Sequence, residues 1–443
     1  MMKFDKFFTL AREAGIEALE IYVRKSSNLS FSLFQTHLDS YSISDKQTLA
    51  ARGIFKGQMA YAYSEKIDKT TPKFIIDQLL ENAKNLDKDT KPVIFKGSER
   101  YKKFNAFNPN LKAYPVEKKI DLLHQIEAKL KNSDERISEI GGLQYEESTE
   151  EVMLFNSYGL SLKQKSNYFV IYAEAVVKDG EDIKTGYKIY LDNDIAKFDV
   201  DSFVDNVKNE AISKLGGKPC ASKKYKTLLG AKVVSSLLSA LLTSTIAEEV
   251  QKHSSLFEGK IGEQVASKKV TIIEDPSKKN VFNRYFDDEG VATYKKTIID
   301  KGVLKTYLYN LETAQKEETN TTGNGYRSSA KSSIGTDYVN ITLKPGKKSE
   351  KEIIEGIKEG IYIKDVQGLH AGLNSQSGNF SLQASGFMIR DGKIQEPVNL
   401  ITVAGNLLQL FKDVIAVSSD SELQLSSTTT SSVLVKKLSI SGK

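Results

Sequence analysis

The sequence is poor in cysteine and histidine, lacks tryptophan, and contains no long apolar run. Its only cysteine, Cys220, excludes an intramolecular disulfide and fits a reducing compartment. No stretch approaches the ~18 consecutive apolar residues of a membrane-spanning helix. The first residues, MMKFDKFFTLAREAG, carry charges where a signal peptide needs an apolar core. We therefore expect a soluble cytoplasmic protein that does not enter a membrane.

The shortage of histidine excludes the common helical zinc-protease motif. That motif needs histidines at positions i and i+4, so that both imidazoles lie on one helix face, with a glutamate beside the first. None of the four histidines has another within a helical turn. His253, near the end of an expected helix, and His370, in a glycine-rich loop, stay as alternative metal ligands. The nucleophile elbow and the phosphate-binding loop are also missing from the sequence.

One acidic run, FDDEGV at 286–291, has two interpretations. Asp287 and Asp288 could bind Mg²⁺ or Ca²⁺, or act as an acid and a base. The simpler interpretation is a turn between strands, which an aspartate stabilises and which leads into Gly290. We favour the turn.

Positive charge exceeds negative charge only slightly, with a net charge of +6. Lysine pairs are spread along the whole chain, and no basic block stands out. Scattered lysines are typical of a soluble surface rather than of a nucleic-acid-binding face. The sequence therefore does not favour direct nucleic-acid binding.

The pattern of apolar residues predicts an α+β fold. The N-terminal domain, residues 1–221, is expected to consist of helices packed on antiparallel β-meanders. A helix, a strand meander and a second helix are predicted within 1–95, where Pro72 is a helix-start signal. The same order is predicted within 110–217, where Pro115 is another such signal. The repeated order suggests an internal duplication.

A linker rich in glycine, lysine and serine, 216–226, is expected to precede the C-terminal domain, residues 222–443. This domain is predicted to be mainly antiparallel β-sheet built around one buried helix, from about Leu228 to His253. The apolar side of that helix is too wide for a surface helix. A short helix is also predicted at 406–414.

Two segments rich in glycine, serine and asparagine, 320–329 and 368–386, raise a question of function. Small residues let another backbone approach closely. These segments could add a peptide strand to a sheet edge or form a subunit interface. They could equally form a tightly packed bend in a barrel-like sheet. Within the second segment, our candidates for peptide contact are Gly378, Asn379, Phe380 and Ser381.

Six segments, in the same order, resemble the TldD/PmbA family, whose members were once called modulators of DNA gyrase. They include ARGIFKGQMAYAYSEKID, similar to the family's Arg-Gly-x-x-x-x-Gly pattern, and FNSYGLSL, similar to its Asn-Ser-x-Gly turn. The matching segments are 51–68, 155–162, 254–276, 286–310, 322–327 and 378–414. The resemblance extends over nearly the whole chain.

The resemblance implies two kinds of subunit. TldD-type subunits carry H-E-x-x-x-H on a helix and a cysteine near the C-terminus, which together bind a catalytic metal. PmbA-type (TldE) subunits lack these ligands and pair with a TldD-type partner. Here the motif would lie at about Leu238–Thr243, which reads LSALLT, and the cysteine at about Val417–Ser419, which reads VSS. The chain therefore resembles the PmbA type, with no catalytic residue of its own and zinc or a similar metal in the partner.

The sequence leaves three alternative functions for this chain. The first, which the resemblance implies, is the non-metal-binding subunit of a TldD/PmbA-like metalloprotease. It would shape the cavity of a cradle-like dimer and bind unfolded peptide for maturation or antitoxin degradation, with a TldD-type subunit or a second copy as partner. The second is a self-sufficient homodimeric peptidase with an atypical metal site, drawn from His253, His370, Asp287 and Asp288. The third is a non-enzymatic protein-binding factor, such as a gyrase modulator.

Overall fold

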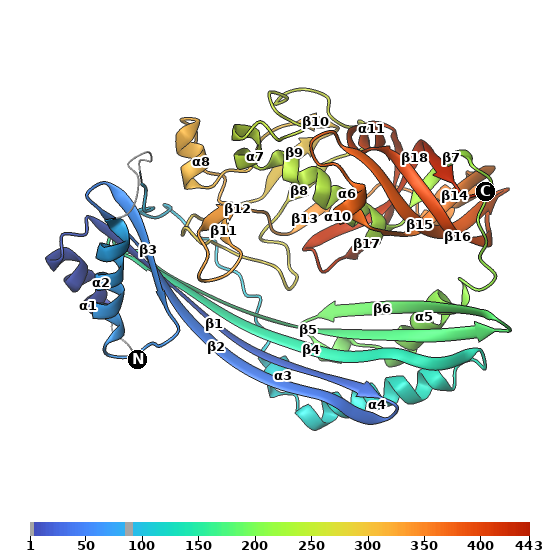
Figure 1. The fold of residues 1–443 in the computed structure, drawn as a ribbon, viewed down its shortest axis with the longest axis horizontal. Helices are drawn as coiled ribbons and strands as arrows, with labels where there is room; N and C mark the ends of the chain where they lie inside the picture. The colour runs from blue at the N-terminus through green and yellow to red at the C-terminus, as the bar shows by residue number, and fades with distance from the viewer. Residues whose placement is uncertain (1–3, 85–91) are drawn as a thin grey trace.

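The computed structural model describes residues 4–84 and 92–443 and confirms the α+β fold. The remaining stretches, 1–3 and 85–91, both belong to the predicted unit 1–95 and lie outside the described residues. An N-terminal region forms one long, curved sheet, and a C-terminal domain lies over the concave side of that sheet (Figure 1).

One antiparallel sheet of six strands, in the order β3-β2-β1-β4-β5-β6, runs through both predicted N-terminal units. The first unit supplies β1 to β3 and the second supplies β4 to β6, and the units join where β1 pairs with β4. The predicted order of helix, meander and helix is thus present twice, within a single sheet. The strands are β1 (Ala18–Phe34), β2 (His37–Phe55), β3 (Gln58–Ser64), β4 (Ile137–Asn156), β5 (Ser161–Asp179) and β6 (Asp182–Asp192).

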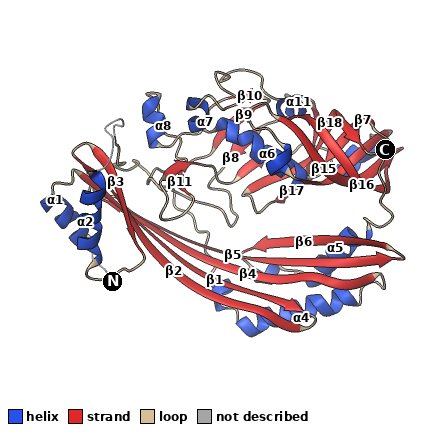
Figure 2. Ribbon diagram, in the orientation of Figure 1, coloured by secondary structure: helices blue, strands red, loops and turns tan. Residues whose placement is uncertain are grey.

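Helices cover one face of this sheet near its two ends (Figure 2). Successive side chains of a strand point to opposite faces, so alternate residues meet the helices. Ile21 of β1 is buried in the cluster under one helix pair, and Phe31 of the same strand is buried under the other. The first pair is α1 (Asp5–Glu13) and α2 (Thr71–Ala83), and the second is α4 (Val116–Lys131) and α5 (Val200–Ile212), while α3 (Pro109–Ala113) and η1 (Ile195–Lys197) lie in connections.

Ten strands form the main sheet of the C-terminal domain, and five of them close into a ring. β7, β14, β15, β16 and β18 pair in that order, and β18 pairs back with β7. Most pairs are antiparallel, as predicted, but β13–β18 and β14–β7 are parallel. The ring strands are β7 (Lys223–Leu229), β14 (Glu359–Gln367), β15 (Asn379–Arg390), β16 (Lys393–Asn406) and β18 (Thr428–Ser441).

Shorter elements complete the domain. The other strands of the main sheet are β8 (Ile272–Glu274), β9 (Lys296–Asp300), β10 (Val303–Leu304), β13 (Ile341–Leu343) and β17 (Val414–Leu423), while β11 (Gly325–Arg327) pairs with β12 (Ile334–Thr336). The short helices are α8 (Leu311–Lys316), α9 (Glu350–Glu355), α10 (Leu369–Gly372) and α11 (Leu407–Lys412), the last of which confirms the helix predicted at 406–414. Across the described ranges, no helix is both long and apolar enough to cross a membrane.

The helix predicted from about Leu228 to His253 has the wrong bounds. The structure instead has β7, helix α6 (Ala231–Leu242), the turn η2 (Thr243–Thr245) and helix α7 (Ala247–Gln251). Ile246 has an extended backbone, with φ −75° and ψ 123°, so the helix cannot pass through it. Strand β7 also includes the last four residues of the predicted linker, 223–226.

Helix α6 is nevertheless the buried central helix that the sequence predicts. Eight of its twelve residues are buried, and it packs against β18 and β14. Its remaining residues form a stripe of small or charged side chains along one side: Lys232, Ser236, Ser239 and Ala240.

Candidate functional site between the two domains

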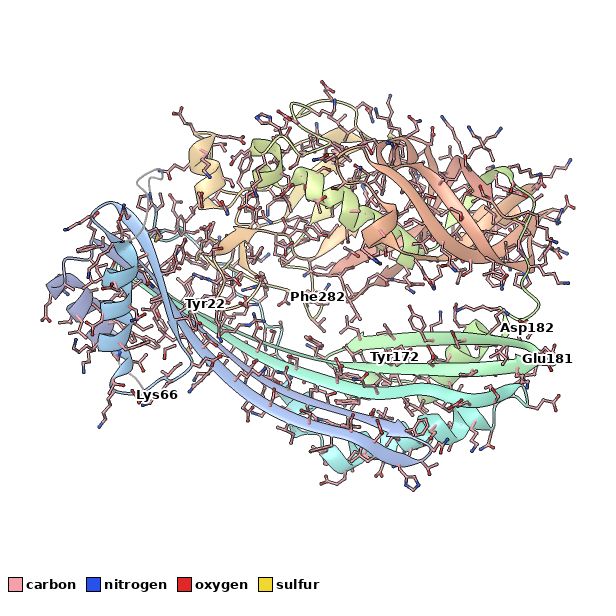
Figure 3. All side chains as sticks on the ribbon, in the orientation of Figure 1. Tyr22, Lys66, Tyr172, Glu181, Asp182 and Phe282 are labelled. Carbon is pink, nitrogen blue, oxygen red and sulfur yellow. The ribbon has the colours of Figure 1, made fainter. Side chains whose placement is uncertain are left out.

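The face of the sheet that looks toward the C-terminal domain is small and polar on β1 and β2 and bulky on β5 and β6. Ser30 of β1 lies opposite Ser42 of β2, whereas Tyr172 of β5 lies opposite Ile189 of β6. Figure 3 shows Tyr172 on the face of the sheet that looks toward the C-terminal domain, and Phe282 on the side of that domain that looks toward the sheet. Side chains of the two domains thus face each other.

A cavity of about 350 Å³ lies between β6 and the first turn of α6, and we call it the α6 cavity. Its apolar lining comes from both domains: Ile189 and Leu191 from β6, and Leu423 and Leu425 from the hairpin of β17 and β18. The lining also contains charged side chains of both signs: Lys188, Lys214, Lys232, Lys364, Glu210, Asp365 and Glu422.

Lys232 of α6 bridges the two domains at this cavity. Its Nζ lies 3.0 Å from Oδ1 of Asp365 and also contacts the hydroxyl of Tyr187 on β6. Burial lowers the pKa of Lys232, but the contacts with Tyr187 and Asp365 outweigh burial, so the pKa is raised. The ammonium group therefore keeps its charge and holds the edge strand of the sheet beside α6.

A second cavity, of about 280 Å³, is lined by Arg24 of β1 and Arg284 of the C-terminal domain, and we call it the arginine cavity. Nε of Arg24 donates to Oε2 of Glu150 at 2.6 Å. Nη2 of Arg284 donates to Oδ1 of Asp288 at 2.6 Å. Neither arginine stands out in the sequence, because the two lie far apart in the chain and neither belongs to a motif.

The α6 cavity and the arginine cavity both lie between the sheet and the C-terminal domain, and we call the two together the trough. They come close at the turn between β17 and β18, where Ser426 lines the α6 cavity and its neighbour Ser427 lines the arginine cavity. Figure 3 shows Tyr22, Phe282 and Tyr172 from left to right along the boundary between the two domains. The trough is closed near Tyr22, because that side chain packs in one hydrophobic cluster with residues of the C-terminal domain.

The residues that the resemblance aligns with metal ligands do not fit a zinc site. Leu238 is fully buried and belongs to the same hydrophobic core as Val417. Thr243 is exposed just after α6, and the hydroxyl of the buried Ser418 donates to the backbone oxygen of Asp420 at 3.2 Å. A zinc site needs deprotonated N, O or S donors in a preformed shell. These side chains do not provide one.

The structure does not bring the four predicted metal candidates together. His253 is exposed, and its Nδ1 lies 2.6 Å from Oε1 of Glu258. His370 is exposed in α10. Asp287 and Asp288 are buried where the two domains meet. In the part of the chain that the structure describes, no group of three or more His, Cys, Asp or Glu side chains is arranged to hold a metal ion.

The acidic run forms the turn that we favour from the sequence. Oδ1 of Asp287 accepts hydrogen bonds from the N–H groups of Glu289 and Val291, at 3.0 and 2.9 Å. Gly290 has a φ of +83°, a conformation that favours glycine. Burial and the charge of Glu289 raise the pKa of Asp287 well above its usual value. Asp287 therefore keeps its proton at a higher pH than an ordinary aspartate does.

A buried ion-pair network joins the two domains beside this turn. Arg52 of β2 donates to Glu20 of β1 at 2.7 and 2.9 Å, and to Glu289 of the C-terminal domain at 3.3 Å. Burial lowers the pKa of Arg52, but the charges of Glu20 and Glu289 outweigh burial and raise it. We did not predict this network from the sequence, although an arginine inside the run LAARGIF is a signal of a buried, paired charge.

The four predicted peptide contacts lie at the start of β15. The side chain of Phe380 is 4% exposed and belongs to the core of the C-terminal domain. Gly378 is buried, whereas Asn379 and Ser381 are exposed. The backbone here pairs with β16 on one side and forms a bridge to Leu373 on the other. Backbone pairing on both sides thus leaves little free sheet edge in this segment, and peptide contact at these four residues stays a prediction.

Two domain models of one family match the chain. The PmbA/TldA metallopeptidase central domain matches residues 109–215, and the C-terminal domain of the same family matches residues 222–442. A metalloprotease of Methanocaldococcus jannaschii is 27% identical over 85% of this chain and 84% of that protein. A PmbA homolog of Haemophilus influenzae is 25% identical over 98% and 94%, and a TldD homolog of the same organism is 24% identical over 94% and 89%.

Two solved structures are similar over the full length of the chain. A protein of Thermotoga maritima described as a modulator of a DNA gyrase has a TM-score of 0.92 at 29% identity, with 99% of both chains covered. TldE of Thermococcus kodakarensis has a TM-score of 0.90 at 24% identity, with 99% and 100% covered, which shows the same fold. Because the domain models and the relatives agree, we conclude that the chain belongs to the PmbA/TldD family.

Proposed function

We propose that this chain is the non-metal-binding subunit of a PmbA/TldD-type metalloprotease, and that its trough holds unfolded peptide for a partner that cuts the peptide. One observation supports this most strongly. The trough borders α6, yet Leu238 and Thr243 stand where the family's metal ligands would be. The chain thus offers a binding surface without a catalytic ligand set. Zinc or a similar divalent metal would belong to the partner.

The peptide would lie extended along β6. This strand is an edge of the six-stranded sheet, so within the described residues its outer backbone groups have no strand partner. An extended peptide can pair with such an edge through its own backbone, whatever its sequence. Ile189 of β6 and Leu425 of the facing hairpin, 42% and 50% exposed, would contact its apolar side chains. An unfolded peptide suits this site, because its backbone groups are unpaired.

The partner would be a TldD-type subunit or a second copy of this chain. Identity to the PmbA and TldD homologs of Haemophilus influenzae is nearly equal, at 25% and 24%. The residues at the ligand positions are therefore what favour the PmbA type. The substrates would be small or unfolded peptides of the cytoplasm, in peptide maturation or antitoxin degradation.

Reconstitution tests the proposed function. The chain and a TldD-type subunit of the same organism are purified separately, and cleavage of an unfolded fluorescent peptide is measured for each and for the mixture. We expect no cleavage by the chain alone, and more cleavage by the mixture than by the TldD-type subunit alone. Cleavage by the chain alone that a chelator abolishes would favour a self-sufficient peptidase. Association without any effect on cleavage would favour a non-enzymatic protein-binding factor.

A further inference from the structure

We propose that the arginine cavity binds the C-terminal carboxylate of the peptide that lies in the trough. This inference rests on the proposed function and adds which end of the peptide is recognised, and by which side chains. Three features support it: two arginines that come from opposite domains, a buried acceptor without a partner, and the position of the cavity at the closed end of the trough.

The two arginines bring guanidinium N–H donors to the cavity, and each arginine is paired with one carboxylate. Of the described residues that line it, Arg24 and Arg284 are cationic and Glu150 is the one carboxylate. Arg24 uses Nε and Nη2 on a single oxygen of Glu150, and Arg284 uses Nη2 on Asp288. A guanidinium has further N–H donors in the same plane, and these match the two oxygens of a carboxylate. The side chains of Arg24 and Arg284 are 36% and 23% exposed, so a ligand can reach them.

Asn283 adds an acceptor beside these donors. The residue lines the cavity and is 3% exposed, and its Oδ1 has no hydrogen-bond partner among the described residues. A buried polar atom without a partner is costly, and an N–H group of a ligand would satisfy it. Asn283 is held in place because its backbone oxygen accepts a hydrogen bond from Nε2 of Gln164 on β5 at 2.7 Å. The last residue of a peptide carries both groups that these side chains could bind, a carboxylate for the guanidinium donors and an adjacent N–H for the amide oxygen.

The cavity lies where the trough ends. Val152 of β4 lines the cavity and also belongs to the hydrophobic cluster that joins the sheet to the C-terminal domain. Tyr22, Tyr285 and Phe286 are buried in that cluster, and Figure 3 shows Tyr22 just beyond Phe282. The middle of a peptide would have to continue through these packed side chains, whereas the end of a peptide would not. We therefore assign the carboxylate to the C-terminus rather than to an acidic side chain.

Peptide binding to the full chain, followed by fluorescence anisotropy, tests the assignment. One labelled, unstructured peptide has a free C-terminal acid, a second has the same sequence with a C-terminal amide, and a third is the amide with one internal glutamate. We expect the acid to bind about tenfold more tightly than the amide, because a hydrogen bond to a charged group is worth about that factor. The internal glutamate should not restore the affinity.

Variants of Arg24 test whether the preference for the acid peptide depends on this side chain. Arg24→Gln should bring the affinity for the acid down to about that for the amide. Arg24→Lys keeps the charge but not the planar fork, so it should keep only part of the preference for the acid. Lys46→Gln is the matched control, because Lys46 lies opposite Ser26 on the neighbouring strand and does not line the cavity. Thermal unfolding of each variant shows whether the chain is folded.

Each alternative outcome has a distinct meaning. Equal affinity for the acid and the amide would overturn the assignment while leaving peptide binding in the trough intact. A preference for the acid that persists in folded Arg24→Gln, or affinity fully restored by the internal glutamate, would also overturn it. Failure of all three peptides to bind would overturn the proposed peptide-binding function, and this inference with it.

Discussion

Arg52 is the residue on which the junction between the two domains depends most. Its guanidinium contacts Glu20 within the sheet and Glu289 across the domain boundary, and all three side chains are at most 4% exposed. Removal of one partner from a buried ion pair leaves the other charge uncompensated. Arg52→Met should therefore lower the free energy of unfolding by about 3–5 kcal/mol, as measured by urea denaturation.

An exposed ion pair provides the control for that variant. Lys73 and Asp77 of α2 pair at 2.6 Å, with side chains 76% and 55% exposed. Solvent screens such a pair, so Lys73→Ala should cost less than about 0.5 kcal/mol. If Arg52→Met costs no more than Lys73→Ala, the buried network does not hold the domains together.

Asp287 should make the stability of the chain depend on pH. Burial, and then the charge of Glu289, raise its pKa in the folded chain. Folded Asp287 thus keeps its proton at a pH where the unfolded chain has already lost it. Because the folded state then binds more protons, stability falls as the pH rises above the ordinary aspartate value, by up to about 1.4 kcal/mol per pH unit for one group.

Asp287→Asn removes this titration. The variant also loses the acceptor for the N–H of Gly325, now bonded to Oδ2 of Asp287 at 2.9 Å, but that cost does not change with pH. Between about pH 5 and pH 8 the variant should therefore lose less stability than the unmodified chain does. Urea denaturation at several pH values measures both slopes. An equal or steeper loss in the variant would mean that Asp287 is ionised in the folded chain.

At the scale of elements, local signals predict much of the N-terminal region. Pro72 and Pro115 stand at the starts of α2 and α4, and the Asp-Gly turn at 179–180 lies between β5 and β6. Such signals act within a few residues, so the sequence alone reveals them. The helix predicted to reach His253 fails at Ile246, because the extended backbone there forms a bridge to a distant residue, Leu308. A local pattern cannot reveal that contact.

Strand β6 should bind peptide through its edge and its apolar face. Ile189 lines the α6 cavity, so Ile189→Lys should weaken peptide binding about tenfold or more by removing buried apolar surface. Ile183→Lys is the matched control, because Ile183 lies on the same strand, is 56% exposed and does not line the cavity. Fluorescence anisotropy measures both variants. Equal losses, or no loss from either, would remove β6 from the peptide site.

At the scale of the whole molecule, the trough comes from the meeting of two domains. Arg52 and Glu289, which join those domains, lie 237 positions apart in the chain. The resemblance indicates the family, because its motifs lie in order along the sequence. The resemblance does not locate the trough. The trough lies between side chains that strand pairing and domain contact bring together, and motif order along the sequence does not show which side chains these are. The candidate contacts at 378–381 do not line either cavity of the trough.

The central claim is that this chain binds peptide and holds no catalytic metal of its own. Its most direct test is the metal content of the purified chain, loaded with Zn²⁺, desalted and measured by elemental mass spectrometry. We predict less than about a tenth of an equivalent of zinc per chain, because Leu238, Thr243 and Ser418 are not a zinc-ligand set. A content near one equivalent that is lost when His253 or His370 is replaced would contradict the claim.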